Sequence, residues 1–264
     1  MPVLLTRPAS AVARATASLL LDDGAQVRLF GPNAPAELRA RGAFVASGDH
    51  DDHGLLEAAL AQVHTLIHTG PGLLVDNPDR LVIEGVLVLD AAVRAGVERI
   101  VLLSLPGASP KADDALRAAA GRLEAYAASL DVPTVVVRTS VVDTVALRDA
   151  VAFLHRTPDE VVIAPVRVED VAAALLAIDQ ARSNVSAGHV VFTATGAEPL
   201  TLDGWLRRTG VRHDDGTDVV GRVYSPGGGR TVLTDALAGP WTDDVGDSVA
   251  ELWAFAAVTP GRIG

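Results

Sequence analysis

An alternation of short apolar runs with helix-like segments is the feature that most constrains how this chain folds. Residues 3–5 form an apolar run typical of a buried strand, and Pro8 stands where a helix can begin, because the first residue of a helix needs no N–H. Apolar residues then recur at helical spacing to about Leu21, and Asp-Asp-Gly at 22–24 closes the predicted helix. The next apolar run is 26–30. This strand–helix–strand order predicts the opening unit of a doubly wound α/β fold.

The same alternation continues to about residue 140. Continuous apolar runs such as 100–103 and 135–137 are typical of parallel strands that are covered on both faces. The pattern therefore predicts the fold class α/β, with a doubly wound, mostly parallel Rossmann-like sheet. Further strands are predicted at 43–47, 65–68, 99–104 and 134–138, with helices at 55–61, 78–95 and 113–130.

After residue 138 the alternation is less regular. We expect a single domain over 1–264, with a Rossmann core at about 1–140 and 161–195. The segments 141–160 and 196–264 are expected to form a cleft and a small C-terminal lobe. Within this part the sequence predicts helices at 149–155, 169–181, 202–208 and 248–257, and extended segments at 161–168 and 189–193.

Composition argues against several classes of partner and site. The net charge of −11 argues against a nucleic-acid surface, and the chain has no cysteine for disulfides or thiol chemistry. It shows neither a signal-peptide pattern nor an apolar run approaching the ~18 residues of a membrane span. His50, His53 and the acids between them are more typical of a solvated loop than of a metal site, so no metal is predicted. We therefore expect a cytoplasmic protein without a nucleic-acid or membrane partner.

Four later segments carry a resemblance to a known family. In their order and spacing they resemble the short-chain dehydrogenase/reductase superfamily, in its extended and atypical, NmrA-like branches. The resemblance covers roughly residues 3–205 and implies a Rossmann fold of the kind that binds NAD or NADP. The segments are 48–52 (G-D-x-x-D), 90–101 (D-A-A-x-x-A-G-V-x-R-x-V), 166–172 (V-x-V-x-D-V-A) and 195–202 (T-G-x-E-x-L-T-L).

The turn after the first strand departs from the family pattern, which reads T-G-x-x-G-x-x-G. Thr6 keeps its place, but Arg7, Ser10 and Ala13 occupy the three glycine positions. Glycines there allow a tight turn, close approach of backbone to the pyrophosphate, and close packing of helix on strand. Thr6, Arg7 and Ser10 remain candidate cofactor-binding residues. Arg7 either binds the 2′-phosphate of NADP or fills and closes the vacated phosphate site, and the change at Ser10 favours the second alternative.

Other candidate cofactor residues follow the second, third and fourth predicted strands. NAD-binding relatives have an acidic residue at the end of the second strand, whereas here Asn33 follows that strand and can hydrogen-bond a ribose. Asp49 and His50 match positions that contact adenine in relatives, although a polar turn before a helix explains them as well. Thr69 and Gly70 follow the fourth strand. The predicted cofactor is therefore either none or NADP.

The Tyr-x-x-x-Lys motif of the family's catalytic members is missing. The only lysine is Lys111, and the residue four positions before it is a glycine. In relatives the tyrosine is the acid/base and the lysine lowers its pKa. The family's catalytic serine is usually the second of a Ser-Ser pair after the fifth strand, but here Ser104 is followed by Leu105. The remaining catalytic candidates are His68, Ser104, Arg138 and His155.

The sixth predicted strand leads to the candidate substrate residues. Arg138, Thr139 and Ser140 stand where the family has R-P-G, close to its substrate cleft. Asp143 and His155 follow in the segment that usually lines that cleft. These five residues are the predicted cleft residues, and a small organic molecule is the predicted ligand.

Three functions remain open from the sequence. The first is a divergent protein that binds a small organic ligand without standard NAD(P) redox chemistry, as a sensor, an accessory protein or a cofactor-free isomerase or cyclase. The second is an NADPH-dependent reductase. The third is a non-catalytic partner in a homo- or heterodimer, formed through the helices predicted at 78–95 and 113–130.

Overall fold

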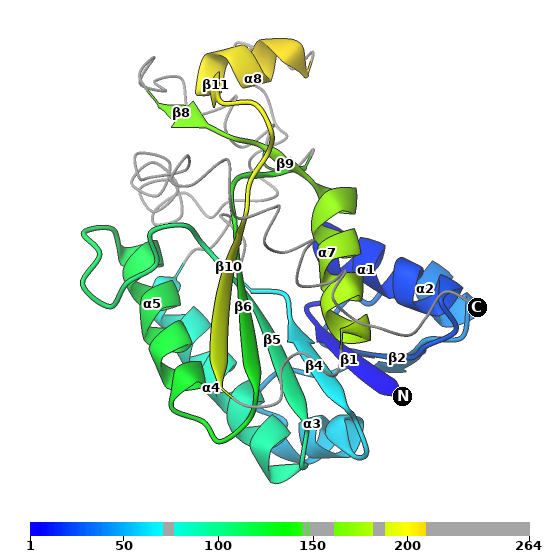
Figure 1. The fold of residues 1–264 in the computed structure, drawn as a ribbon. Helices are drawn as coiled ribbons and strands as arrows, with labels where there is room; N and C mark the ends of the chain where they lie inside the picture. The colour runs from blue at the N-terminus through cyan, green and yellow to red at the C-terminus, as the bar shows by residue number, and fades with distance from the viewer. Residues whose placement is uncertain (71–76, 145–146, 148–160, 182–187, 210–264) are drawn as a thin grey trace.

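The computed structural model describes residues 1–70, 77–144, 147, 161–181 and 188–209. Their centre is a seven-stranded sheet of order β10-β6-β5-β4-β1-β2-β3, in which all neighbouring strands are parallel (Figure 1). The predicted doubly wound Rossmann-like sheet is thus confirmed. Its strands are β1 (Pro2–Thr6), β2 (Gln26–Phe30), β3 (Phe44–Ala46), β4 (Thr65–His68), β5 (Arg99–Ser104), β6 (Thr134–Thr139) and β10 (His189–Ala194).

Helices cover both faces of the sheet. On one face, Leu56, Val88 and Leu123 join a buried cluster with the strands. On the other, Leu20 and Leu175 belong to a second cluster. The helices of the first face are α3 (His53–Leu60), α4 (Pro78–Arg94) and α5 (Ala115–Ala128), and those of the second are α1 (Ala11–Asp22), α2 (Ala36–Ala40) and α7 (Val168–Gln180).

The strand order places β1 between β2 and β4. From β1 the chain runs in one direction to β2 and β3 and later in the opposite direction to β4, β5 and β6. The carboxyl ends of β1 and β4 therefore flank the switch point of the sheet, which is where open α/β sheets bind ligands.

The turn between β1 and α1 differs from the prediction. The helix begins at Ala11, not near Pro8, because the backbone of Ser10 is extended and its side chain caps the helix. Pro8 instead lies against Gly31 after β2, where an added Cβ would come within 2.9 Å of Pro8 Cδ. Gly31 has φ +135°, which also favours glycine there.

Other helix ends follow from their capping residues. Asn77 caps α4 ahead of Pro78, and Gly96 follows the helix with φ +73°. Asp114 caps α5, so this helix is shorter than the predicted 113–130. The short helix α2 was not predicted from the sequence, because its five residues bury only Leu38 and therefore show no helical period.

A smaller group of elements follows the carboxyl ends of β6 and β10 (Figure 1). The predicted extended segment 161–168 forms two short strands on either side of Ala164 and Pro165. The predicted helices at 149–155 and 248–257 lie outside the described residues. The elements are β7 (Val142–Asp143), β8 (Val162–Ile163), β9 (Val166–Arg167), β11 (Leu200–Thr201) and α8 (Leu202–Arg208), with β7 paired to β9 and β8 to β11.

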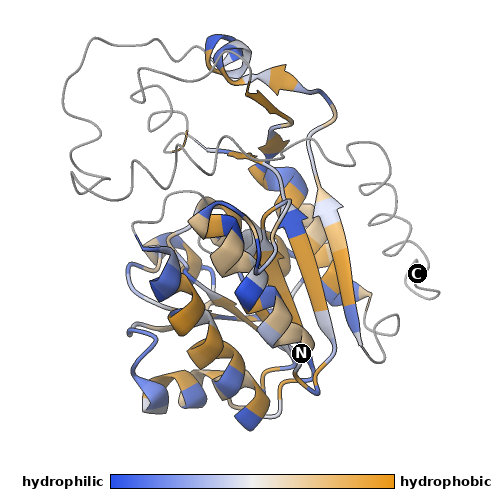
Figure 2. Cartoon of the chain, turned by 90° about the vertical axis from the view of Figure 1, so that its left-hand side faces the viewer, coloured by the Kyte–Doolittle hydropathy of each residue, from blue (hydrophilic) through white to orange (hydrophobic). Residues whose placement is uncertain are grey.

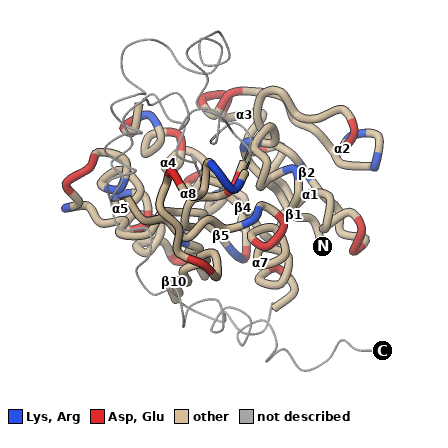
Figure 3. The backbone as a smooth tube through the Cα atoms, turned by 90° about the horizontal axis from the view of Figure 1, so that it is seen from above, with Lys and Arg blue, Asp and Glu red and all other residues tan. Residues whose placement is uncertain are grey.

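Hydropathy and charge follow this arrangement. Hydrophobic residues concentrate along the strands, whereas the helices alternate between hydrophobic and hydrophilic residues (Figure 2). Acidic and basic residues are interspersed over several helices and loops (Figure 3). Within the described ranges, no helix combines the length and the apolar character needed to cross a membrane.

Candidate functional site

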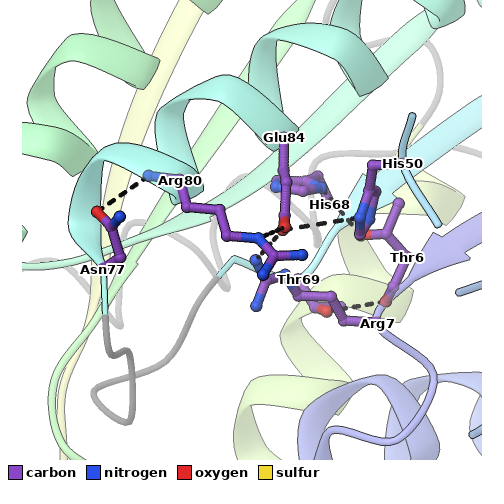
Figure 4. Close-up of polar contacts among 8 residues, drawn as sticks. All are labelled: Thr6, Arg7, His50, His68, Thr69, Asn77, Arg80 and Glu84. Atoms are coloured by element: carbon purple, nitrogen blue, oxygen red, sulfur yellow. Dashed lines mark hydrogen bonds and ion pairs between the residues drawn. The ribbon is translucent and has the colours of Figure 1, made fainter. Parts of the chain in front are cut away.

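The candidate site lies at the switch point, where the ends of β1 and β4 are joined by side chains (Figure 4). Thr6 Oγ1 and His68 Nδ1 share a hydrogen bond of 2.9 Å, and Thr69 Oγ1 donates to the carbonyl of Thr6 at 3.0 Å. Burial lowers the pKa of His68 to about 3, and the positive charge of Arg7 acts in the same direction. His68 is therefore neutral at pH 7, and its ring joins two strands from inside the protein.

Arg7 takes the first glycine position and also takes a backbone conformation that favours glycine. Its φ is +52°, and its N–H donates to the carbonyl of Phe30 at 3.2 Å. Its guanidinium Nη2 donates to Glu84 Oε2 on α4 at 2.9 Å. The Arg7 side chain is 28% exposed and that of Glu84 is 17% exposed. Burial lowers the pKa of Arg7, while Glu84 opposes this change by stabilising the charged form.

Glu84 is surrounded by basic side chains. Arg80 Nε, one helical turn earlier, donates to Glu84 Oε1 at 2.6 Å. His50 Nδ1 lies 3.7 Å from Glu84 Oε2, and its ring meets the ring of Phe30 edge-on. Burial lowers the pKa of His50, which the neighbouring Glu84 carboxylate partly offsets. The carboxylate of Glu84 thus lies between Arg7, Arg80 and His50 (Figure 4).

The amino end of α1 is capped by the chain itself. The N–H of Ala13 donates to Ser10 Oγ at 3.1 Å. In a dinucleotide site the amides of this helix end face the pyrophosphate. Here one of them is bonded by a side chain that a glycine at this position would not supply.

We expect Ser10→Ala to lower the free energy of unfolding by about 1 kcal/mol, because it removes the N-cap of α1. Ser10→Gly should cost only a few tenths of a kcal/mol, since glycine is a tolerated N-cap. Urea denaturation of the two variants measures the difference. A loss of only a few tenths of a kcal/mol in Ser10→Ala would show that the cap contributes nothing.

The remaining predicted cofactor residues follow the strands β2, β3 and β4. Asn33, with φ +56°, and Asp49 are exposed after β2 and β3. Thr69 is buried, and its hydroxyl is used by the bond to the carbonyl of Thr6. At Gly70 an added Cβ would lie 2.7 Å from the carbonyl oxygen of Leu103, so the backbone needs glycine there.

The described catalytic candidates lie on the neighbouring strands β4, β5 and β6, and Ser104 is the register partner of Arg138. His68 and Ser104 are buried at the ends of β4 and β5. The hydroxyl of Ser104 has no hydrogen-bond partner within the described ranges. His155 lies outside them. No described candidate combines an exposed acid/base group with a nucleophile.

Arg138 faces α5. Its Nε and Nη2 donate to the two carboxylate oxygens of Glu124 at 3.0 and 2.6 Å, and Nη2 also donates to the carbonyl of Ala108 at 3.1 Å. The pair lines a groove of about 250 Å³ between α5, the loop after β5 and the edge strand β10. Burial lowers the pKa of His189, which lines the same groove.

Of the other predicted cleft residues, Thr139 and Ser140 are buried at the end of β6, and Asp143 lies in β7. None of these three lines the groove beside Arg138. Sequence reasoning missed Arg80 and Glu84 altogether. The only available signal was their i, i+4 spacing on the helix after the fourth strand.

Sequence comparison identifies no relative, because no family model and no curated protein matches the chain. Solved structures do match. The Citrobacter sp. triphenylmethane reductase complexed with NADP(H) aligns with a TM-score of 0.73 and 15% identity, over 96% of this chain and 95% of that chain. A nucleoside-diphosphate-sugar epimerase from Staphylococcus aureus aligns with a TM-score of 0.71 and 13% identity, over 97% of this chain and 99% of that chain.

A third match is a short-chain dehydrogenase/reductase superfamily protein from Agrobacterium tumefaciens with bound NAD. It aligns with a TM-score of 0.60 and 20% identity, over 79% of this chain and 81% of that chain. Identities this low carry information on the fold and not on the reaction. The chain therefore has a Rossmann-like fold similar to the folds of these three proteins.

Proposed function

We propose that this chain is a divergent Rossmann protein that binds a small organic ligand without standard NAD(P) redox chemistry. The observation that carries the proposal is the ion pair of Arg7 and Glu84 at the switch point. A dinucleotide brings a negatively charged pyrophosphate to this place and needs close approach to backbone N–H groups. Here the first glycine position carries a long side chain, and a carboxylate of the same sign as the phosphate is already bound to it.

The sequence supplies a second line of support. Catalytic members of the family that the sequence resembles usually transfer a proton from a Tyr-x-x-x-Lys pair, and this chain has no such pair. NmrA-like members often lack the pair, so its absence supports the proposal only together with the ion pair at the switch point. His68 does not replace it, because the ring is buried and its pKa is about 3, far from the working pH of a general acid or base. Cofactor-free binding is therefore the function that fits these residues best.

The test is the thermal stability of the purified protein with and without millimolar NADH and NADPH. We expect no shift of Tm with either dinucleotide. A ligand at 100 times its Kd would add about 2.7 kcal/mol, which raises Tm by several degrees in a chain of this length. The NADP(H)-binding triphenylmethane reductase, measured in parallel, serves as the positive control. A clear shift with either dinucleotide would contradict the proposal.

A second candidate is an NADPH-dependent reductase. The observation in its favour is the pair of guanidinium groups, Arg7 and Arg80, beside the switch point, since guanidinium binds phosphate well. The fold match to a reductase complexed with NADP(H) agrees with it. A Tm shift with NADPH and none with NADH would favour this candidate. The formation of a homo- or heterodimer remains a prediction. Measuring the molecular mass of the protein in solution, alone and with a candidate partner, tests it.

A further inference from the structure

Two guanidinium groups at the switch point share one carboxylate. Arg7 Nη2 binds Glu84 Oε2 at 2.9 Å, and Arg80 Nε binds Glu84 Oε1 at 2.6 Å. The three side chains come from two places in the chain, the turn after β1 and the first half of α4. Together the two guanidinium groups and the carboxylate carry a net charge of +1.

We propose that Arg7 and Arg80 form an anion site whose resident anion is Glu84, and that a phosphate ester or diphosphate binds there once the charge of Glu84 is removed. The inference rests on the proposed function, because it explains why the unmodified chain does not take a dinucleotide. According to this inference, Glu84 on α4, and not the lost glycines alone, determines which ligand the switch point binds.

The chemistry of the donors supports this exchange. A guanidinium presents N–H groups in a planar fork that fits carboxylate and phosphate alike. Each oxygen of Glu84 is held by a different arginine, as the oxygens of a phosphate group would be (Figure 4). Glu84 therefore occupies the position of an external anion and satisfies its donors.

Unused donor and acceptor atoms beside the carboxylate give independent support. His50 is only 8% exposed, yet its Nε2 has no hydrogen-bond partner in the part of the chain that the structure describes. Arg7 Nε is buried and lacks a partner in the same part of the chain. Buried polar atoms are almost always hydrogen-bonded. A phosphate has more oxygens than a carboxylate, so it offers Arg7 Nε an acceptor that Glu84 does not supply, and it offers one to His50 Nε2 when that nitrogen carries the proton.

The experiment replaces Glu84 by a neutral residue of similar length. Glu84→Gln keeps the size of the side chain, and Glu84→Met is a second neutral variant in case the amide packs badly. Glu57→Gln is the matched control, because it removes the same charge from the exposed Arg94–Glu57 pair elsewhere on this face. Inorganic pyrophosphate and NADPH are the probes, and titration calorimetry at fixed ionic strength gives their Kd for each protein.

We expect Glu84→Gln to bind pyrophosphate at least tenfold more tightly than the wild type and Glu57→Gln to bind it no better. Adding Arg7→Gln to Glu84→Gln should abolish the gain. A folded Glu84→Gln or Glu84→Met variant with unchanged affinity would overturn the inference, as would an equal gain in Glu57→Gln. Tight binding of NADPH by the wild type is a different result, since it contradicts the proposed function and is read from the wild-type titration alone.

Discussion

The free energy of unfolding should fall by about 3 kcal/mol between pH 7 and pH 4 through His68 alone. The unfolded chain takes up this proton near the ordinary histidine pKa of 6.5, whereas the folded protein takes it up only near a pKa of about 3. Between these values the unfolded state binds more protons. The contribution of His68 to stability is therefore complete above about pH 6.5 and is lost as the pH falls towards 3.

Urea denaturation of the wild type and of His68→Asn at pH 7 and pH 4 measures this contribution. Asparagine does not titrate, and its amide can replace Nδ1 in the bond to Thr6. Carboxylates and the other histidines contribute to both proteins, so the difference between their pH dependences isolates His68. Parallel pH dependences for the two proteins would show that His68 is protonated normally in the folded state.

Arg99→Met should lower the free energy of unfolding by about 3 kcal/mol. Arg99 is only 2% exposed, and its guanidinium crosses from the start of β5 to the end of α7. It donates to the carbonyls of Ile178, Asp179 and Ala181 at 2.8, 3.4 and 3.4 Å. The last carbonyls of a helix lack partners within the helix and favour a positive charge. Methionine keeps most of the apolar contact and removes these bonds.

Arg99→Lys is the control for this variant, because it keeps the charge and loses the fork of donors. Its loss of stability should be about half as large. Hydrogen exchange of the α7 amides should show that the helix end opens more easily in Arg99→Met than in the wild type. A loss below about 1 kcal/mol in Arg99→Met would mean that the carbonyls are satisfied without the arginine.

The sheet could be predicted because its strands are buried on both faces. Runs such as 100–103 and 135–137 are apolar at every position, which leaves little choice but a parallel strand under two layers of helix. The helix end at Gly96 was also predictable, because glycine favours the left-handed backbone conformation that ends many helices. In the structure Gly96 has this conformation, with φ +73°. The short helix α2 was not predictable, because a single buried residue, Leu38, gives no helical periodicity of apolar residues.

The candidate site was predictable only in part. The glycine positions showed where the turn departs from its relatives, and the structure places Thr6, Arg7 and Ser10 at the switch point as that comparison implies. The partner of Arg7 was not predictable. Glu84 lies 77 residues away, and its i, i+4 spacing from Arg80 indicates only a local pair on the surface of a helix. Long-range ion pairs follow from strand order, which the sequence pattern leaves open.

The central position of β1 also determines the order in which its two neighbouring strands become available during translation. During translation β1 can pair with β2 as soon as Phe30 has emerged, but its other edge has no partner until β4 arrives at Thr65. At about 5–20 residues per second, that edge stays open for roughly 2–7 s. Its apolar residues, Val3 to Leu5, are fully buried in the finished protein. The edge of β1 in the nascent chain is thus unpaired for seconds before β4 can cover it.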